Sequence, residues 1–125
     1  MQNSLFIDAA FSRPVDRPPV WLMRQAGRYM KEYRAIKEKH TFLEMCRTPE
    51  IAADITMLPV DLLGIDAAIM FSDILVTAEA MGGKLHFENG VGPRFDNPVR
   101  TGADIDALTE PDVDERLGYV ADMIR

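Results

Sequence analysis

The sequence predicts an α/β fold in which two buried parallel strands are joined through helices. Two short apolar runs, at residues 20–23 and 67–71, have the length and composition of strands, and helical patterns occupy the residues between them. A strand, helices and a second strand in this order form a βαβ unit with parallel strands and a right-handed crossover. Because parallel strands are covered on both faces, we expect both runs to be buried.

The first strand is expected at Val20–Met23. The Pro18-Pro19 pair before it fixes extended backbone and cannot donate ladder hydrogen bonds. The Gln25-Ala26-Gly27 tripeptide interrupts the apolar run. Between residues 29 and 39 the pattern is charged and helical, because apolar side chains recur at one-turn spacing. These are Tyr29, Tyr33 and Ile36.

The clearest helix is expected to follow Thr48, a good N-cap, with Pro49 at its first position. Gly64 is a natural C-terminal stop, and Pro59 should kink the helix. A stripe of apolar residues at helical spacing marks one face. If only these 125 residues are present, we expect this stripe to be partly exposed or covered by another chain. Its members are Ile51, Ile55, Leu58 and Leu62.

The second strand, Ala67–Phe71, is expected to precede a helix over Ile74–Met81 that ends at Gly82-Gly83. Residues 84–88 then alternate between polar and apolar, and Asn89-Gly90 is a strong hairpin-turn signal.

A last helix is expected to begin near Pro111, with an apolar stripe and no stop signal before Arg125. A domain rarely ends inside an amphipathic helix, so we expect the first quarter to third of a larger α/β protein. The stripe consists of Val113, Leu117, Val120 and Ile124.

The composition is that of a globular protein, with 47% hydrophobic and 27% charged residues. A formal net charge of −6 argues against nucleic acid as the main partner, because phosphate binding needs a basic face. The single cysteine, Cys46, fits a reducing compartment. No apolar run approaches the roughly 20 residues of a membrane span, and residues 1–12 lack a signal-peptide pattern. We therefore expect a cytoplasmic protein without a membrane partner.

Charged residues follow both expected strands. Arg24 comes just after the first strand and Asp73 just after the second. The carboxyl ends of parallel strands open on one face, where such folds place their sites. Arg24 and Arg28 can present two planar guanidinium forks to carboxylates, and Gly27 lets the backbone turn closely. Asp73 could accept N–H groups or balance positive charge on a bound ring.

Each of these residues also has a simpler interpretation. Arginine pairs at this spacing are more often ordinary surface or ion-pair residues. Asp73 could cap a helix that starts at Ile74, and capping does not exclude binding. His40 and His86 lie far apart with no carboxylate pattern around them, so we expect no metal site. Spacing alone leaves the binding site and these alternatives open.

Four motifs then follow one another in a fixed order. They are residues 19–30 (PVWLMRQAGRYM), 42–50 (FLEMCRTPE), 69–75 (IMFSDIL) and 90–93 (GVGP). Together they resemble the uroporphyrinogen decarboxylase family over residues 14–100 at least. One short motif could arise by chance, whereas four in the right order leave little room for coincidence.

The resemblance implies the N-terminal portion of a (β/α)8 TIM barrel, with its first two parallel strands, their helices and a small hairpin. Residues 1–125 would form the N-terminal part of a single barrel domain that is truncated at its C-terminal end. The family acts as a homodimer, and further site residues come from later strands. The fragment alone is therefore expected to be inactive.

The resemblance also implies site roles and a reaction. Arg24 and Arg28 would bind substrate carboxylates, with the Gln25-Ala26-Gly27 backbone contributing. Asp73 matches the family's central aspartate, which hydrogen-bonds pyrrole N–H groups, and Asp73 and Arg24 are the expected catalytic residues. The implied enzyme is a carboxy-lyase that converts uroporphyrinogen III to coproporphyrinogen III in porphyrin biosynthesis. Protonation of the pyrrole ring supplies an electron sink, so no cofactor and no metal are expected.

Two other interpretations are weighed against this one. A corrinoid-linked methyltransferase of the same superfamily would share the scaffold but use zinc ligands from later in the chain. It would not be expected to carry the sequence at residues 24–29. Alternatively, the chain could be a non-catalytic fragment that associates with another molecule.

Overall fold

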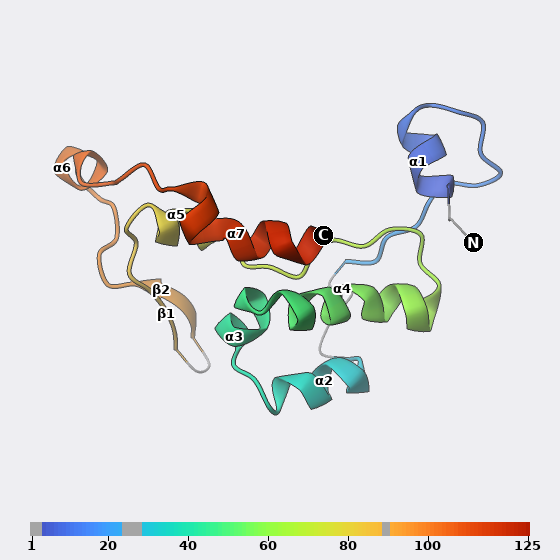
Figure 1. Ribbon diagram of the computed structural model, residues 1–125, viewed down its shortest axis with the longest axis horizontal. Helices are drawn as coiled ribbons and strands as arrows, with labels where there is room; N and C mark the ends of the chain where they lie inside the picture. The colour runs from blue at the N-terminus through green and yellow to red at the C-terminus, as the bar shows by residue number, and fades with distance from the viewer. Residues whose placement is uncertain (1–3, 24–28, 89–90) are drawn as a thin grey trace. The chain divides into compact units, whose positions relative to one another are not determined.

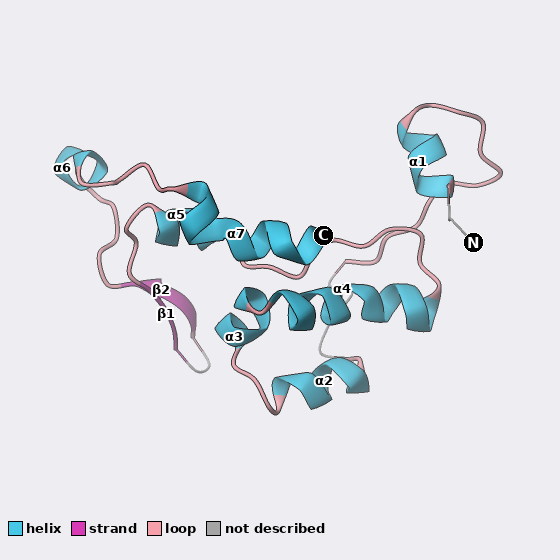
Figure 2. Ribbon diagram, viewed as in Figure 1, coloured by secondary structure: helices cyan, strands magenta, loops and turns pink. Residues whose placement is uncertain are grey.

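The structure is a computed structural model that describes residues 4–23, 29–88 and 91–125. These residues form a mixture of helices and strands, α1–α7 and β1–β2 (Figures 1 and 2). The chain divides into two compact units with their boundary between Ser72 and Asp73. Each unit has its own elements.

The first unit is helical and has a small core. Its helices are α1 (Leu5–Ala10), α2 (Lys31–Lys37), α3 (Phe42–Arg47) and α4 (Pro49–Leu63). Helices α2 and α3 both contact α4, drawn in green in Figure 1. The core consists of the buried residues Met30, Tyr33, Met45 and Ile55, packed against Ile36, Phe42, Ile51, Leu58 and Phe71.

The helix predicted after Thr48 is confirmed. Thr48 is the N-cap of α4 in extended backbone, and Gly64 is its C-cap in the left-handed conformation, with φ of 64°. Glycine adopts this conformation without a Cβ penalty, and the Gly64 N–H donates to the Val60 carbonyl at 3.0 Å. The helix continues through Pro59, which is buried.

The expectation of a partly exposed apolar stripe on α4 is only partly correct. Leu62 is 51% exposed, and Leu58 is partly buried. The prediction is wrong for Ile55, which is fully buried. The reason is that α2 and α3 supply Tyr33 and Met45 to the same cluster.

Helix α2 is shorter than the helix predicted over residues 29–39. The apolar periodicity of the sequence does not indicate α3. A capping box begins α3. The Thr41 N–H donates to the Glu44 carboxylate at 2.7 Å, and the Glu44 N–H donates to Thr41 Oγ1 at 3.3 Å. These hydrogen bonds, the one from the Thr41 backbone above all, hold the pKa of Glu44 below its ordinary value.

The two predicted parallel strands are not formed among the described residues. Residues 20–23 and 67–71 have irregular backbone. They are not buried as expected, since Met23 is 75% exposed and Ile69 is 62% exposed. A parallel pair buried on both faces needs neighbouring strands and covering helices, and a two-stranded sheet is only marginally stable. The runs nevertheless begin side by side, because the Asp66 N–H donates to the Val20 carbonyl at 3.0 Å.

The second unit contains a hairpin and short helices. Its elements are α5 (Val76–Ala80), β1 (Leu85–Glu88), β2 (Gly92–Phe95), α6 (Gly102–Asp106) and α7 (Val113–Ile124). Strands β1 and β2, magenta in Figure 2, pair antiparallel with Leu85 opposite Phe95 and Glu88 opposite Gly92. The predicted hairpin is thus confirmed, although its Asn89-Gly90 turn lies outside the described residues.

Close packing at the base of the hairpin requires Gly83. A Cβ at this position would lie 2.5 Å from the Phe95 ring and 2.7 Å from a carbonyl oxygen of α5. The Asn97 side chain holds the same region, because its Oδ1 accepts the Lys84 N–H at 2.7 Å and its Nδ2 donates to the Gly82 carbonyl at 3.0 Å.

The last predicted helix is confirmed as α7, two positions beyond Pro111. Asp112 is its N-cap, and the Asp112 carboxylate accepts the Glu115 N–H at 3.1 Å. None of its residues is buried, and Val113 and Ile124 are 61% and 75% exposed. The predicted apolar stripe is therefore half-buried at its centre and exposed at both ends.

Candidate active site

The five substrate-binding residues predicted after the first apolar run lie outside the described residues. Their two described neighbours, Met23 and Tyr29, are 75% and 55% exposed. The next residue, Met30, is 5% exposed, belongs to the core and is the N-cap of α2. The chain is thus anchored directly after this segment. The five residues are Arg24, Gln25, Ala26, Gly27 and Arg28.

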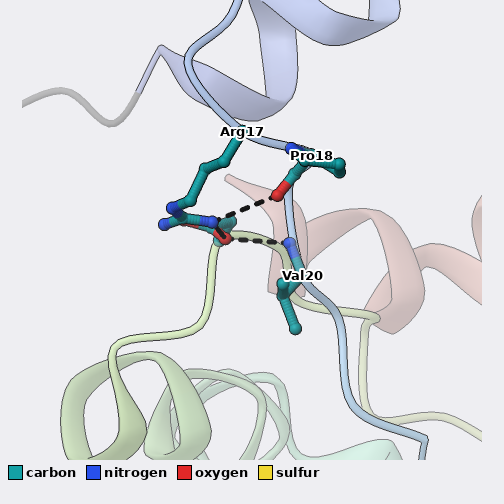
Figure 3. A network of polar contacts seen from close by, with 4 residues as sticks. Arg17, Pro18 and Val20 are labelled. Carbon is teal, nitrogen blue, oxygen red and sulfur yellow. Dashed lines mark hydrogen bonds and ion pairs between the residues drawn. The ribbon is translucent and has the colours of Figure 1, made fainter.

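A second anchor lies before the same segment. The Arg17 guanidinium donates to both carboxylate oxygens of Asp66, at 2.6 Å from Nη1 and 2.7 Å from Nη2 (Figure 3). Nη1 also donates to the Pro18 carbonyl at 3.2 Å. The Val20 N–H donates to Asp66 Oδ2 at 2.8 Å, and the Val20 carbonyl accepts the Asp66 N–H. The hydrogen bond to Asp66 raises the pKa of Arg17.

Asp73, the predicted catalytic carboxylate, begins the second unit and leads into a turn. Its Oδ1 accepts the N–H of Leu75 at 3.3 Å, and its Oδ2 is buried. Helix α5 starts at Val76 with Leu75 as its N-cap. A helix beginning at Ile74 with Asp73 as its cap is therefore not formed. The carboxylate instead stabilises the turn before the helix.

The run that leads to Asp73 is seated on the core of the first unit. The Phe71 N–H donates to Thr56 Oγ1, a hydroxyl of α4, at 2.8 Å. The Phe71 ring lies 5.9 Å from the Tyr33 ring and 5.8 Å from the Phe42 ring, edge to face with the latter. These contacts fix the chain two positions before Asp73.

The chemistry open to Asp73 follows from its chemical type and its contacts. An ionised carboxylate accepts hydrogen bonds and cannot donate them. The bond from Leu75 fixes the direction of its Oδ1. Such a group can accept ring N–H donors and stabilise a positive charge that develops beside it.

Other candidate groups contribute less. In the part of the chain that the structure describes, no group of three or more histidine, cysteine or acidic side chains could hold a metal ion. His86 Nδ1 lies 3.3 Å from Asp96 Oδ1, and both side chains are exposed. Cys46 is buried in α3. Across residues 4–23, 29–88 and 91–125, no helix combines the length and apolarity that a bilayer crossing requires.

A cavity in the second unit, which the sequence patterns do not indicate, has a volume of about 420 Å³. It is bounded by the end of α5, by β2 and by α6, and Asp73, the predicted site residue that the structure describes, does not line it. Its two polar side chains already hold backbone groups, Asn97 at the hairpin and Asp104 in the cap of α6. The apolar part of its lining includes Met81, Phe95, Val99 and Leu108.

The contact between Arg17 and Asp66 could not be predicted by pattern reasoning. The two residues are 49 positions apart, and neither stands in a recognisable spacing. Only the prolines after Arg17 mark this part of the chain as extended.

Comparisons with known proteins point to one family. A family model described as uroporphyrinogen decarboxylase (URO-D) matches residues 1–125. A curated protein named uroporphyrinogen decarboxylase from Geobacter metallireducens is 57% identical over 123 residues, which cover 98% of this chain and 36% of the relative. Proteins of the same name from Chloroherpeton thalassium and Chlorobaculum tepidum are 53% and 54% identical over 125 residues, which cover all of this chain and 35% and 36% of the relatives.

This chain therefore spans about a third of the length of the curated relatives that it matches. The match nevertheless extends over every residue of the chain. The chain belongs to the uroporphyrinogen decarboxylase family.

Proposed function

We propose that this chain is the N-terminal part of an enzyme that removes the acetate carboxyls of uroporphyrinogen III to give coproporphyrinogen III in porphyrin biosynthesis. The family match over residues 1–125 carries the proposal, together with relatives of that name at 53–57% identity. Activity would require a protein of family length that contains these residues, called the full-length protein below. The substrate is a small molecule, and the enzyme is proposed to be a cytoplasmic homodimer.

The proposed fold of the full-length protein is a (β/α)8 barrel, to which residues 1–125 contribute the first part of a single domain. Residues 20–23 and 67–71 would be its first two strands. The hydrogen bond from the Asp66 N–H to the Val20 carbonyl supports this, because it joins the beginnings of the two runs. The exposure of Met23 and Ile69 is consistent with apolar surface that further strands and helices would cover.

The anion-binding role is assigned to the segment after the first run. Arg24 and Arg28 would hold the acetate and propionate carboxylates of the substrate through bidentate hydrogen bonds, with the Gln25-Ala26-Gly27 backbone contributing. Local arginines are needed for this, because the chain as a whole carries a net charge of −6. Arg24 is also proposed to help deliver the proton to the pyrrole ring.

Asp73 is proposed to stabilise the cationic form of the ring. Protonation of the ring carbon next to the one that bears the acetate makes the ring cationic, with positive charge shared by the acetate-bearing carbon. The bond to the carboxylate carbon then breaks, and its electron pair forms a double bond from the methylene carbon to the ring as CO2 leaves. A proton added to the methylene carbon and the loss of the proton from the ring carbon give the methyl group and the neutral pyrrole. A fixed carboxylate that accepts the ring N–H groups lowers the energy of the cationic state. The oriented Oδ1 of Asp73 supports this role.

The test is to incubate the full-length protein with uroporphyrinogen III and measure CO2 release and coproporphyrinogen formation. We expect both in a fixed ratio without an added metal or organic cofactor. The Asp73→Asn variant should bind substrate with much slower turnover. A folded full-length protein that releases no CO2 would overturn the proposal.

A further inference from the structure

We propose that Arg17 and Asp66 form a positioning pair that fixes the alignment of the segment carrying Arg24 and Arg28. The pair would act through the backbone and not by touching substrate. This inference rests on the proposed function, since it concerns where the substrate-binding arginines are held.

The first support is the burial and the hydrogen bonding of Asp66. Its side chain is 4% exposed, whereas that of Arg17 is 54% exposed. Both carboxylate oxygens accept from Arg17, and Oδ2 also accepts the Val20 N–H. Burying a carboxylate costs free energy unless it is paired with a cation and hydrogen-bonded. The hydrogen bond of Asp66 to the Val20 N–H therefore depends on the ion pair with Arg17. Figure 3 shows Arg17 and the backbone at Val20 converging on this carboxylate.

The second support is that Asp66 satisfies both backbone groups of one residue. The Val20 N–H donates to its side chain at 2.8 Å, and the Val20 carbonyl accepts its backbone N–H at 3.0 Å. A slip of the first run by one residue would break both bonds. A slip by one residue shifts the chain that follows by up to about 3.3 Å, the rise of one fully extended residue. Bidentate hydrogen bonds to a carboxylate do not tolerate a shift of this size.

The third support is the anchor on the other side of the segment. Met30 is buried in the core at the N-terminus of α2. Arg24 and Arg28 therefore stand in the sequence between two residues whose positions are fixed, Val20 and Met30. Loss of the Arg17 contact would weaken the first fixed point, Val20, and leave the core around Met30 intact.

The chain offers a matched control in the ion pair between Arg13 and Asp8. Arg13 Nη1 lies 2.9 Å from Asp8 Oδ1, and the side chains are 60% and 27% exposed. The two residues are only five positions apart. The pair has the same chemical types as Arg17 and Asp66 but links neighbouring turns of one segment.

The experiment compares Arg17→Gln with Arg13→Gln in the full-length protein, measuring kcat and KM for uroporphyrinogen at a temperature where circular dichroism shows both to be folded. We expect Arg17→Gln to raise KM about 10-fold or more and to change kcat less, because misplacement of a binding group by about 1 Å already costs this much. Arg13→Gln should leave both constants unchanged. Arg17→Lys keeps the charge but loses the bidentate fork, and we expect an intermediate KM.

A readout that is independent of activity is amide hydrogen exchange at Val20. Arg17→Gln should speed exchange at this amide at least 10-fold while the amides of α4 stay protected. Unchanged exchange at Val20, or faster exchange throughout the first unit, would overturn the positioning role. If Arg17→Gln does not fold, Arg17→Lys decides, and an unchanged KM would overturn the proposal.

Arg24→Gln separates this proposal from the proposed function. If Arg24→Gln leaves KM unchanged, the substrate-binding role of the segment is wrong. If Arg24→Gln raises KM but Arg17→Gln behaves like Arg13→Gln, the proposed function stands and the positioning pair is rejected.

Discussion

The Phe71 N–H donates to the Thr56 hydroxyl at 2.8 Å, which ties the run before Asp73 to the middle of α4. The same hydroxyl donates to the Ala52 carbonyl at 2.7 Å, so it acts as donor and acceptor at once. Helix α4 is confirmed and well defined by its caps. The position of Phe71 is therefore set by a helix that forms from local signals.

Thr56→Val should destabilise the full-length protein by about 1 kcal/mol, because the shape is kept but the partly buried Phe71 N–H loses its acceptor. Thr56→Ser retains the hydroxyl and should restore much of this loss. Urea denaturation measures both. The exposed Thr77 of α5 provides the control, since Thr77→Val should change little. Equal effects at the two positions would contradict the role of the hydroxyl.

Asp73→Asn should lower kcat of the full-length protein on the order of 100-fold and change KM less, because the charge of the carboxylate acts on a cationic state that exists only after protonation. The asparagine oxygen can still accept the Leu75 N–H, so stability should barely change. Steady-state kinetics and thermal denaturation check this. Near-normal turnover would leave Arg24 and Arg28 as the only functional anchors in this part of the protein.

Ile55→Ala should cost about 2–5 kcal/mol of unfolding free energy, because it opens a cavity in the core of the first unit where Ile55 is fully buried. Leu62→Ala, at a position that is 51% exposed in this chain, is the comparison. In the isolated 125-residue chain its cost should be much smaller. If Leu62→Ala costs as much in the full-length protein, the remaining part of that protein covers this face.

Protonation of Glu44 should reduce the free energy of unfolding at acidic pH. Hydrogen bonds from Thr41 lower the pKa of Glu44 in the fold from its ordinary value of 4.5. Its contribution is therefore fully present above the unfolded pKa and is lost as pH falls through the folded pKa. Glu44→Gln should reduce stability at pH 7, and the difference from the parent protein should shrink below pH 4.5. A difference that is constant across this range in denaturation experiments would rule out the linkage.

Gly83→Ala should destabilise the hairpin, because the new methyl group would lie 2.5 Å from the Phe95 ring and 2.7 Å from the Ala78 carbonyl oxygen. Gly118 of α7 is the control, since a Cβ there meets nothing within 4 Å. Gly118→Ala should stabilise by up to about 1 kcal/mol, as alanine favours a helix interior. Hydrogen exchange of the Leu85 and Phe95 amides reports on the hairpin directly. Unchanged protection in Gly83→Ala would show that the Phe95 ring can move aside.

Local signals in the sequence explain which elements could be predicted. Helix α4 has an N-cap, a proline at its first position and a glycine stop, all within its own residues. The hairpin and α7 are likewise marked by short-range patterns. The two expected strands depend on partners far away in sequence, of which the contact between Val20 and Asp66 is one.

The candidate site could be predicted to a similar extent. The motif around Arg24 and Arg28 is recognisable from its amino-acid sequence, but its residues 24–28 lie outside those that the structure describes. The role of Asp73 stays a prediction, whereas the predicted start of the following helix at Ile74 is wrong, because α5 begins at Val76 with Leu75 as its N-cap. The contact of Arg17 with Asp66 depends on folding across 49 positions and has no local pattern.

The hydrogen bonds of Val20 make the two edges of residues 20–23 different, because Asp66 occupies the edge that Val20 uses. In extended backbone, each residue directs its N–H and carbonyl to one edge, and the next residue directs its groups to the opposite edge. The edge used by Val20 is occupied by Asp66, through one main-chain and one side-chain bond. If the run forms a strand in the proposed barrel, a strand on the opposite edge would pair with the main-chain groups of Trp21. The Asp66 contacts thus reserve one edge of the first run for the run that Asp66 precedes, and a further strand would pair on the other edge.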